Sequence, residues 1–226
     1  LILINTPHNP TGRVFSRSEL EAVAALCRDH DLICVSDEVY ERLVFEGEHI
    51  SIATLPGMRE RTVTLSSLGK TFSFTGWKIG WAIAPPHLTA GVRAAHQFLT
   101  FCAPTPLQVA AVEALRTGAD YDRQFIAEYR QRRDFMASGL AEAGFEVYVP
   151  AGTYFIMCDH SRFGFEDDLA FCRFLVSDIG VAAIPPGSFY CDRREGRRLV
   201  RFSFCKREAT LRAAIDRMRG LRARLG

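Results

Sequence analysis

Four short apolar stretches constrain the fold of this chain more than any other feature. They cover residues 1–5, 32–36, 62–66 and 79–84 and are rich in β-branched and other apolar side chains. Stretches of this length and composition are typical of buried strands. Buried strands of this kind belong to parallel sheets whose connections are helices. We therefore predict an α/β fold with a mostly parallel sheet.

Helix signals occupy the chain between and after these stretches. The segment Ser16-Arg17-Ser18-Glu19 has the form of a capping box, and apolar residues follow it at helical spacing. Further helices are predicted near residues 88–101, 105–117 and 121–143. The third is long and heavily charged, as a helix that links two domains would be.

The chain after Gly144 has a different pattern. Short strands are predicted near residues 145–149, 154–158, 181–184 and 199–204, and helices near residues 167–178 and 207–225. This mixture indicates a smaller α+β unit. We therefore predict two domains, residues 1–119 and residues 120–226, with the long charged helix leading into the second.

Composition excludes several classes of protein. A chain of 226 residues that is 48% hydrophobic and 24% charged can bury a large core, so disorder is not expected. A net charge of +2 gives no electrostatic reason to expect a nucleic-acid partner. The apolar stretches are far too short to span a bilayer, and the sequence shows no signal-peptide pattern. We predict a cytoplasmic protein without a membrane partner.

The seven cysteines are scattered and form no C-x-x-C pair. An odd number of cysteines, most of them inside apolar runs, favours reduced buried thiols over disulfides or a zinc site. The histidines are also dispersed. We therefore predict that the protein has no metal site.

Polar residues follow the ends of three predicted strands. Asn9 follows the first strand, Asp37 and Tyr40 follow the second, and Ser67 and Lys70 follow the third. Each could have an ordinary structural role, such as a turn former, a helix cap or a packing residue. Because parallel strands present their carboxyl ends at one edge of a sheet, the recurrence predicts a ligand site there.

The stretch SLGKTFSFTGWKIG, residues 67–80, contains two lysines, Lys70 and Lys78, that need an explanation. A phosphate-binding P-loop requires G-x-x-x-x-G-K-[ST], but the residue five before Gly69 is Thr64, which lies in a predicted strand. The dinucleotide-binding pattern G-x-G-x-x-G and the serine-hydrolase pattern G-x-S-x-G are also missing from the sequence.

A pyridoxal phosphate site explains both lysines better. That cofactor needs an amine for a Schiff base, a carboxylate at its ring nitrogen, donors at its phenolic oxygen, and a cation with a hydroxyl at its phosphate. The sequence offers these groups, in that order, as Lys70, Asp37, Tyr40 with Asn9, and Ser67 with Lys78. One lysine would then react and the other would bind the phosphate.

The motifs that carry these residues resemble those of the fold-type I, class I aminotransferases, which depend on pyridoxal phosphate. They are N-P-T-G at 9–12, D-E-V-Y at 37–40, S-x-x-K at 67–70, T-G-W-K-I-G at 75–80 and R-F-S-F at 201–204. The resemblance covers essentially the whole chain in the family's order. With G-T-Y-F at 152–155, it is most similar to the branch of kynurenine, methionine and succinyldiaminopimelate aminotransferases.

The resemblance implies a role for each residue. It places Asn9 and Tyr40 at the phenolic oxygen, Asp37 at the pyridine nitrogen, Ser67 and Lys78 at the phosphate, Lys70 in the Schiff base, and Arg201 with Asn9 at the substrate carboxylate. Lys70, Asp37 and Tyr40 would be the catalytic residues. Many relatives have arginine where this chain has Lys78, and lysine keeps the charge but loses the two-pronged guanidinium.

The resemblance also implies a function. It predicts transamination between an L-amino acid and a 2-oxo acid by a homodimer, with residues 1–119 as the last part of the cofactor-binding large domain and residues 120–226 as the small domain. Because the chain starts inside an apolar run without an initiator Met, we expect the family's N-terminal segment to precede it. Two alternatives remain: a C–S β-lyase with the same cofactor, and a non-catalytic aminotransferase-like sensor domain of a transcription regulator.

Overall fold

The computed structural model describes residues 1–221, which divide into two compact units. The first unit contains Leu1–His8 and Arg13–Ile126, and the second contains Asn9–Gly12 and the chain from Ala127 onward. Each unit is described by itself below. The domain boundary at residues 119 and 120 stays a prediction.

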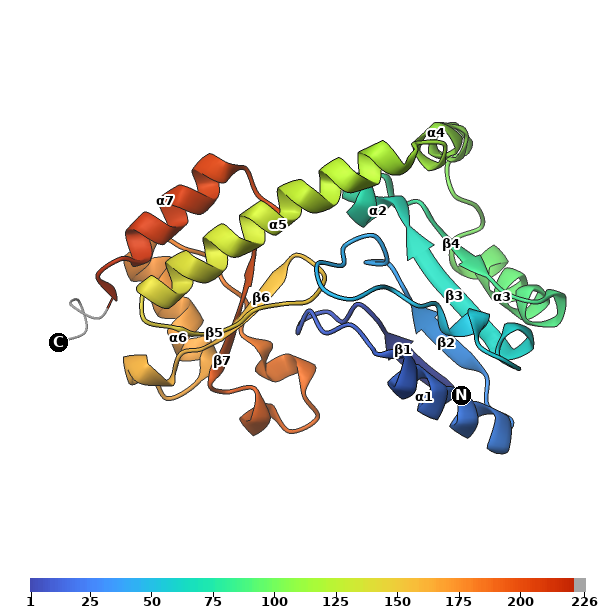
Figure 1. The fold of residues 1–226 in the computed structure, drawn as a ribbon, viewed down its shortest axis with the longest axis horizontal. Coiled ribbons are helices and arrows are strands. Elements are labelled where there is room, and N and C mark those ends of the chain that lie inside the picture. The colour runs from blue at the N-terminus through green and yellow to red at the C-terminus, as the bar shows by residue number, and fades with distance from the viewer. Residues whose placement is uncertain (222–226) are drawn as a thin grey trace. The chain divides into compact units, whose positions relative to one another are not determined.

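A four-stranded sheet forms the centre of the first unit (Figure 1). Its strands, in the order in which they pair, are β1 (Ile2–Asn5), β2 (Cys34–Asp37), β3 (Thr62–Ser67) and β4 (Gly80–Ile83). The pairs β1–β2 and β2–β3 are parallel, so the predicted mostly parallel α/β sheet is confirmed.

The fourth strand corrects the prediction in one respect, because β4 is antiparallel to β3. Residues 68–79 connect the two strands and contain only α2 (Leu68–Thr71) and a 3-10 turn (Thr75–Trp77). A parallel crossover usually needs a longer helix that runs back across a face of the sheet. The short connection therefore reverses the chain direction.

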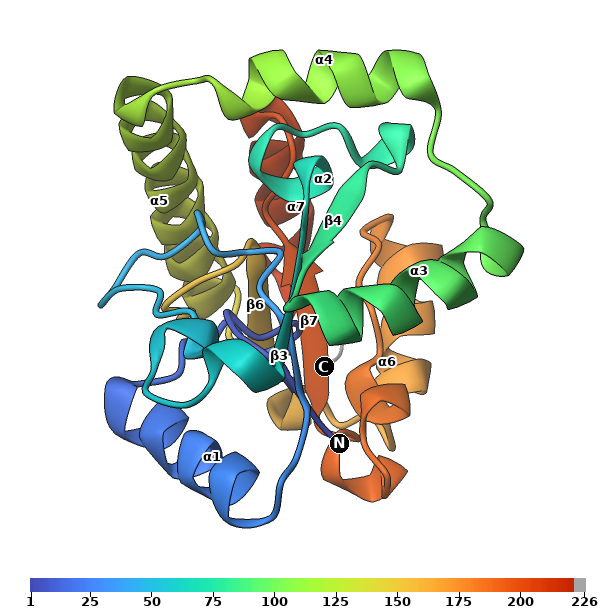
Figure 2. The ribbon, with the colours of Figure 1, turned by 90° about the vertical axis from the view of Figure 1, so that its right-hand side faces the viewer.

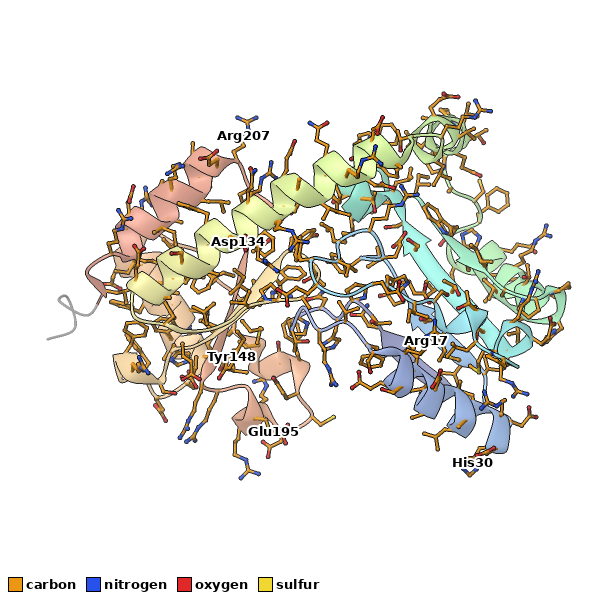
Figure 3. All side chains as sticks on the ribbon, viewed as in Figure 1. Arg17, His30, Asp134, Tyr148, Glu195 and Arg207 are labelled. Atoms are coloured by element: carbon orange, nitrogen blue, oxygen red, sulfur yellow. The ribbon has the colours of Figure 1, made fainter. Side chains whose placement is uncertain are left out.

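The helix α1 (Arg17–Asp29) begins with the predicted capping box. The Ser16 hydroxyl accepts from the Glu19 N–H, and the Glu19 carboxylate accepts from the Ser16 N–H. Arg17 and His30 lie at opposite ends of this helix (Figure 3). Its buried face packs on the sheet in a core cluster that includes Ile4, Leu20, Ala24, Cys27, Cys34, Ile52, Leu55 and Met58.

Three helices follow the sheet along the chain (Figure 2). They are α3 (Pro86–Leu99), α4 (Thr105–Leu115) and α5 (Ala119–Glu142), and they confirm the three predicted helices. Proline at the start of α3 and of α4 suits a helix N-terminus, where the missing N–H would have no partner. Several large apolar side chains near the end of α3 are exposed, among them Phe98 and Leu99.

The second unit contains a three-stranded antiparallel sheet with the order β5 (Glu146–Tyr148), β6 (Phe155–Asp159) and β7 (Leu199–Ser203). Its helices are α6 (Asp168–Phe174), which continues into a π-helical turn at Leu175–Ile179, and α7 (Glu208–Met218) (Figure 1). Aromatic rings fill its core: Phe145 makes edge contacts with Phe163, Phe171 and Phe202.

Two predictions for this unit need correction or comment. The predicted strand at 181–184 is wrong, because that segment makes only an isolated bridge between Ile184 and Arg201. Pro185 and Pro186 follow it, and proline has no N–H with which to extend a ladder. The predicted helix at 207–225 is observed as α7, and its predicted last residues, 222–225, lie outside the described residues.

The predicted reduced, buried cysteines are observed in the structure. Cys27, Cys34, Cys158 and Cys172 are buried free thiols. Burial raises the pKa of Cys34 and of Cys172 to about 12, so both thiols stay protonated at neutral pH.

Among residues 1–221, we find no helix with the length and hydrophobicity needed to cross a membrane.

The capping box predicts a measurable contribution to stability. Replacing Ser16 by alanine removes the acceptor of the Glu19 N–H and should lower the free energy of unfolding by about 1 kcal/mol. Glu21→Ala, on the exposed face of the same helix, should change it by less than about 0.5 kcal/mol. Urea denaturation followed by circular dichroism would test this, and equal effects of the two changes would contradict it.

Candidate functional site

Asp37 is the last residue of β2 and lies at the carboxyl edge of the sheet. In the register it pairs with Asn5, the last residue of β1, whose side-chain amide donates to the Asp37 carbonyl oxygen at 3.0 Å. The Val39 N–H donates to Oδ1 of the Asp37 carboxylate at 3.2 Å. Within the described chain, Oδ2 makes no hydrogen bond, so this half-buried oxygen can accept from a ligand. Sequence reasoning missed the supporting role of Asn5.

Tyr40 and Lys70 come together beside this strand end. The Tyr40 side chain is only 2% exposed, and the Lys70 Nζ lies 5.6 Å from the centre of its ring. Lys70 is on α2, which begins directly after Ser67 at the end of β3. Ser67 caps that turn, because its Oγ accepts from the Gly69 N–H at 3.3 Å. The order strand, cap and helical turn thus directs the Lys70 amine toward the phenol.

The T-G-W-K-I-G segment brings the chain back to the end of β3. Gly80 pairs with Ser67 in the β3–β4 register. A Cβ on Gly80 would lie 2.9 Å from the Ser66 carbonyl oxygen and 3.2 Å from the Ser67 Cβ, so only glycine allows this approach. The sequence therefore requires glycine here because two backbones meet.

Lys78 stands two residues before Gly80 and has an unusual backbone conformation. Its φ of 54° lies in the left-handed region, which non-glycine residues adopt rarely and often at functional sites. Its side chain is exposed, and in the described part of the chain the ammonium group makes no hydrogen bond or ion pair.

The second unit brings together Asn9 and Arg201, which lie 192 positions apart in the sequence. The Arg201 Nη1 donates to the Asn9 Oδ1 at 2.8 Å. The guanidinium carbon lies 4.2 Å from the centre of the Phe155 ring and 5.2 Å from that of Phe189. These two rings restrict the plane of the guanidinium, and a fixed plane favours two-point binding of a carboxylate.

A backbone contact places the N-P-T-G turn in the second unit. The Gly12 carbonyl oxygen accepts from the Gly152 N–H at 2.8 Å, so the turn joins the first residue of the G-T-Y-F motif. Gly12 has a φ of 69°, and a Cβ on it would lie 2.2 Å from the Cβ of Pro150. This glycine is required both for its conformation and for the close approach.

The structure therefore forms two groups from the predicted residues. Asp37, Tyr40, Ser67, Lys70 and Lys78 belong to the first unit, and Asn9 and Arg201 belong to the second. Within the first unit, the β2 and β3 ends and the β3–β4 pairing bring the segments of the first group together. In the described residues, no group of three His, Cys, Asp or Glu side chains is placed to hold a metal ion.

Sequence reasoning also missed polar residues behind Asp37 and Tyr40. Glu38 and Glu41 are adjacent to them in the chain; Glu38 is hydrogen-bonded to the buried Ser36 and to His49, and Glu41 to Ser66. Glu38 lies inside the D-E-V-Y motif, but the motif does not show which of its carboxylates faces the sheet edge and which is buried. His49, in the loop after β2, had no signal in the sequence.

The chain is similar to known aminotransferases in sequence. The sequence model of the family described as aminotransferase class I and II matches residues 1–218. A probable N-succinyldiaminopimelate aminotransferase of Mycobacterium tuberculosis is 45% identical over 96% of this chain and 57% of its own length. Human kynurenine–oxoglutarate transaminase 1 is 41% identical, with the same two coverages.

A similar solved structure is YbdL of Escherichia coli, which is described as having a methionine aminotransferase function. It superposes with a TM-score of 0.90 at 39% identity, over 96% of this chain and 57% of that chain. The chain thus spans a little more than half the length of these relatives.

The close approach at Gly80 gives a prediction with a control in the same motif. Gly80→Ala should lower the free energy of unfolding by about 1–3 kcal/mol, because its Cβ would force the Ser66 backbone to shift. Gly76→Ala should change it little, since nothing lies within 4 Å of the added Cβ. Thermal and urea unfolding would measure both, and equal losses would show that the β3–β4 approach is not restrictive.

Proposed function

The chain belongs to the family of class I and II aminotransferases, and on that premise we propose that the protein catalyses pyridoxal-phosphate-dependent transamination between an L-amino acid and a 2-oxo acid. The relatives include all three kinds of aminotransferase that the motifs resemble. Because the chain spans 57% of these relatives, the proposal concerns the activity of the whole protein.

The observation that carries this proposal is the meeting of Lys70 with Tyr40 beside the carboxyl end of β2. An amine next to a buried phenol, with the Oδ2 of Asp37 able to accept a hydrogen bond, is a donor set that fits pyridoxal phosphate. When bound, that cofactor supplies an electron sink for negative charge at the substrate α-carbon.

The residues of the first unit would divide the work. Asp37 would accept a hydrogen bond from the pyridine N–H and so keep that nitrogen protonated. Tyr40 would donate to the phenolic oxygen, while Ser67 and Lys78 would bind the phosphate. Lys70 would link the cofactor covalently, and its amine would then remove the proton from the substrate α-carbon and return it in the second half of the reaction.

Asn9 and Arg201 would bind the substrate carboxylate. The rings of Phe155 and Phe189 lie within cation–π distance of the Arg201 guanidinium and would restrict it, and the hydrogen bond from Nη1 to Asn9 would restrict its rotation. A planar, oriented guanidinium would hold a carboxylate by two parallel hydrogen bonds and thereby orient the α-carbon.

We also propose that the protein acts as a homodimer in the cytoplasm. Phe98, Leu99, Phe101 and Val109, at the end of α3 and in α4, are 65–86% exposed, and large apolar side chains this exposed are typical of a surface that another chain covers. Scattered cysteines that remain free thiols suit a reducing compartment.

Replacing the reactive amine should abolish the activity. Lys70→Ala should remove the visible absorption of the bound cofactor and lower turnover by at least about 10³-fold, because it removes the amine that lies beside Tyr40 and that would form the covalent link. Lys206→Ala, which removes an exposed lysine of the second unit, should retain both. Absorption spectra, with analysis of the products, would test the assignment; pyruvate and ammonia in place of an oxo acid and an aminated acceptor would instead indicate a β-lyase.

The two cations should differ in what they bind. Lys78→Ala should weaken cofactor binding about tenfold or more through the loss of a phosphate ion pair, while Lys78→Arg should restore much of it. Arg201→Ala should instead raise the KM for the amino acid and leave the cofactor dissociation constant nearly unchanged. Equilibrium cofactor titrations and steady-state kinetics on both variants would show this, and the opposite pattern would exchange the two roles.

A further inference from the structure

Segment 184–189, with the sequence I-P-P-G-S-F, contacts Arg201 at both of its ends. At the first residue, the Ile184 N–H donates to the Arg201 carbonyl oxygen and the Arg201 N–H donates to the Ile184 carbonyl oxygen, both at 3.0 Å. At the last residue, the centre of the Phe189 ring lies 5.2 Å from the guanidinium carbon of Arg201. The segment therefore contacts both the backbone and the side chain of this arginine.

The backbone hydrogen bonds at Ile184 fix the start of the segment. Pro185 and Pro186 come next, and they have no N–H with which to extend the pairing with β7. Phe189, at the other end, is 50% exposed, so burial alone does not fix its ring. The position of the ring therefore depends on what holds the 3-10 turn Pro186–Phe189.

Asp168, the first residue of α6, holds this turn by a buried hydrogen bond. Its Oδ2 accepts from the Gly187 N–H at 2.6 Å, and the Asp168 side chain is only 9% exposed. The two residues are 19 positions apart in the sequence. Loss of the carboxylate would leave a buried N–H without its acceptor, which is costly.

The turn is also enclosed from the side opposite Asp168. A Cβ on Gly187 would lie 2.8 Å from the Asp168 Oδ2, and a Cβ on Gly196 would lie 2.7 Å from the Gly187 Cα. The Gly196 carbonyl oxygen accepts from the N–H of Leu199, the first residue of β7, at 2.9 Å. Asp168 thus holds the turn against the chain that leads into the strand of Arg201.

The cap of α6 does not need Asp168, because the preceding residue supplies it. The Asp167 Oδ1 accepts from the Ala170 N–H at 2.7 Å, which is the usual contact of an N-cap. The Asp168 carboxylate is directed instead to Gly187, outside its own helix. Two adjacent aspartates therefore have different roles, and each can be removed without removing the contact of the other.

We propose that Asp168 is a positioning residue that orients Arg201 for the substrate carboxylate. It acts through segment 184–189: the hydrogen bond to Gly187 fixes the turn, and the turn places Phe189 against the guanidinium. The inference rests on the function proposed above, in which Arg201 binds the carboxylate.

The effect of Asp168 should fall on substrate binding. Arg201 also contacts Phe155 and Asn9, which belong to other segments and keep the guanidinium in place when the turn shifts. Without the Phe189 ring, the guanidinium would turn more freely. Because two-point binding of a carboxylate needs an oriented guanidinium, binding of the amino acid should weaken while the chemical step changes little.

Kinetics of the whole protein test this, with the amino donor that the wild type turns over fastest among the twenty common L-amino acids. Asp168→Ala should raise the KM for that donor about tenfold and leave kcat and the cofactor dissociation constant within about threefold. Asp168→Asn should keep the KM within about threefold of the wild type, because its amide oxygen can accept from the same N–H. An unchanged KM in Asp168→Ala, or equal rises in both variants, would overturn the proposal.

A double-mutant cycle tests whether Asp168 acts through the ring. Phe189→Ala should raise the KM about tenfold, because the guanidinium loses the same contact. In the Phe189→Ala background, Asp168→Ala should raise the KM by less than about twofold more. A second tenfold rise would show that Asp168 acts by a route independent of Phe189, which contradicts the proposal.

Hydrogen exchange at the Gly187 amide, in the cofactor-free protein, gives a readout that does not depend on activity. This N–H should exchange slowly in the wild type and at least about tenfold faster in Asp168→Ala, while Asp168→Asn should retain much of the protection. Equal rates in the wild type and in Asp168→Ala would show that Asp168 does not hold the turn in solution.

Asp167→Ala is the matched control, because it removes the cap of α6 and leaves the Gly187 contact. It should lower the melting temperature but change neither the KM nor the exchange of Gly187. A rise in KM as large as that in Asp168→Ala would mean that the KM follows general stability, and would reject the positioning role. If Asp168→Ala does not fold, Asp168→Ser, whose side chain is too short to reach Gly187 as the carboxylate does, should raise the KM in its place.

Failure of this inference and failure of the proposed function have different signatures. If Lys70→Ala abolishes the visible absorption while Asp168→Ala leaves the KM unchanged, the function stands and the positioning role is wrong. If Lys70→Ala retains the absorption, the proposed function is wrong, and with it the positioning role; the exchange of Gly187 then still decides whether Asp168 holds the turn.

Discussion

Parallel hydrogen bonding among β1, β2 and β3 places the ends of three strands side by side, and the candidate site of the first unit depends on that alignment. Residues that are far apart in the chain, such as Asn5, Asp37 and Ser67, reach one edge of the sheet because each ends a strand. The helices and turns that follow then start from fixed positions. A change of register by one residue would turn Asp37 to the other face of the sheet.

The carboxyl edge of the sheet does not by itself fix the positions of the site side chains; hydrogen bonds from neighbouring residues are also needed. A strand end fixes a Cα position, whereas chemistry requires a side chain in a defined rotamer with defined partners. Asn5 holds the Asp37 carbonyl, and the buried Glu38 and the half-buried Glu41 are hydrogen-bonded on the two sides of the turn that carries Tyr40. Burying polar groups is costly unless they are paired, so a buried polar network of this kind specifies one arrangement of the turn.

In the second unit, the orientation of Arg201 depends on aromatic rings and a glycine contact. Its antiparallel sheet places the Arg201 guanidinium near two aromatic rings, and Asn9 of the N-P-T-G turn supplies the oxygen that accepts a hydrogen bond from Nη1. The turn is held by the contact of Gly12 with Gly152, where a side chain on Gly12 would have no room. Aromatic packing and a glycine contact thus orient a charged group without burying it.

The sequence by itself determined the local structure: the short apolar strands, the capping box at Ser16, the helix spans and the motifs that identify the family. These follow from interactions within a few residues, namely side-chain periodicity, capping and the conformational limits of glycine and proline. Only the tertiary structure decided that β4 runs antiparallel, that residues 181–184 form no strand, and that Glu38 pairs with His49 while Glu41 accepts from Ser66. The same holds for the hydrogen bond between Asn9 and Arg201 across 192 positions. Strand direction, desolvation and pairing of distant polar groups depend on which segments pack together, and no local pattern contains that information.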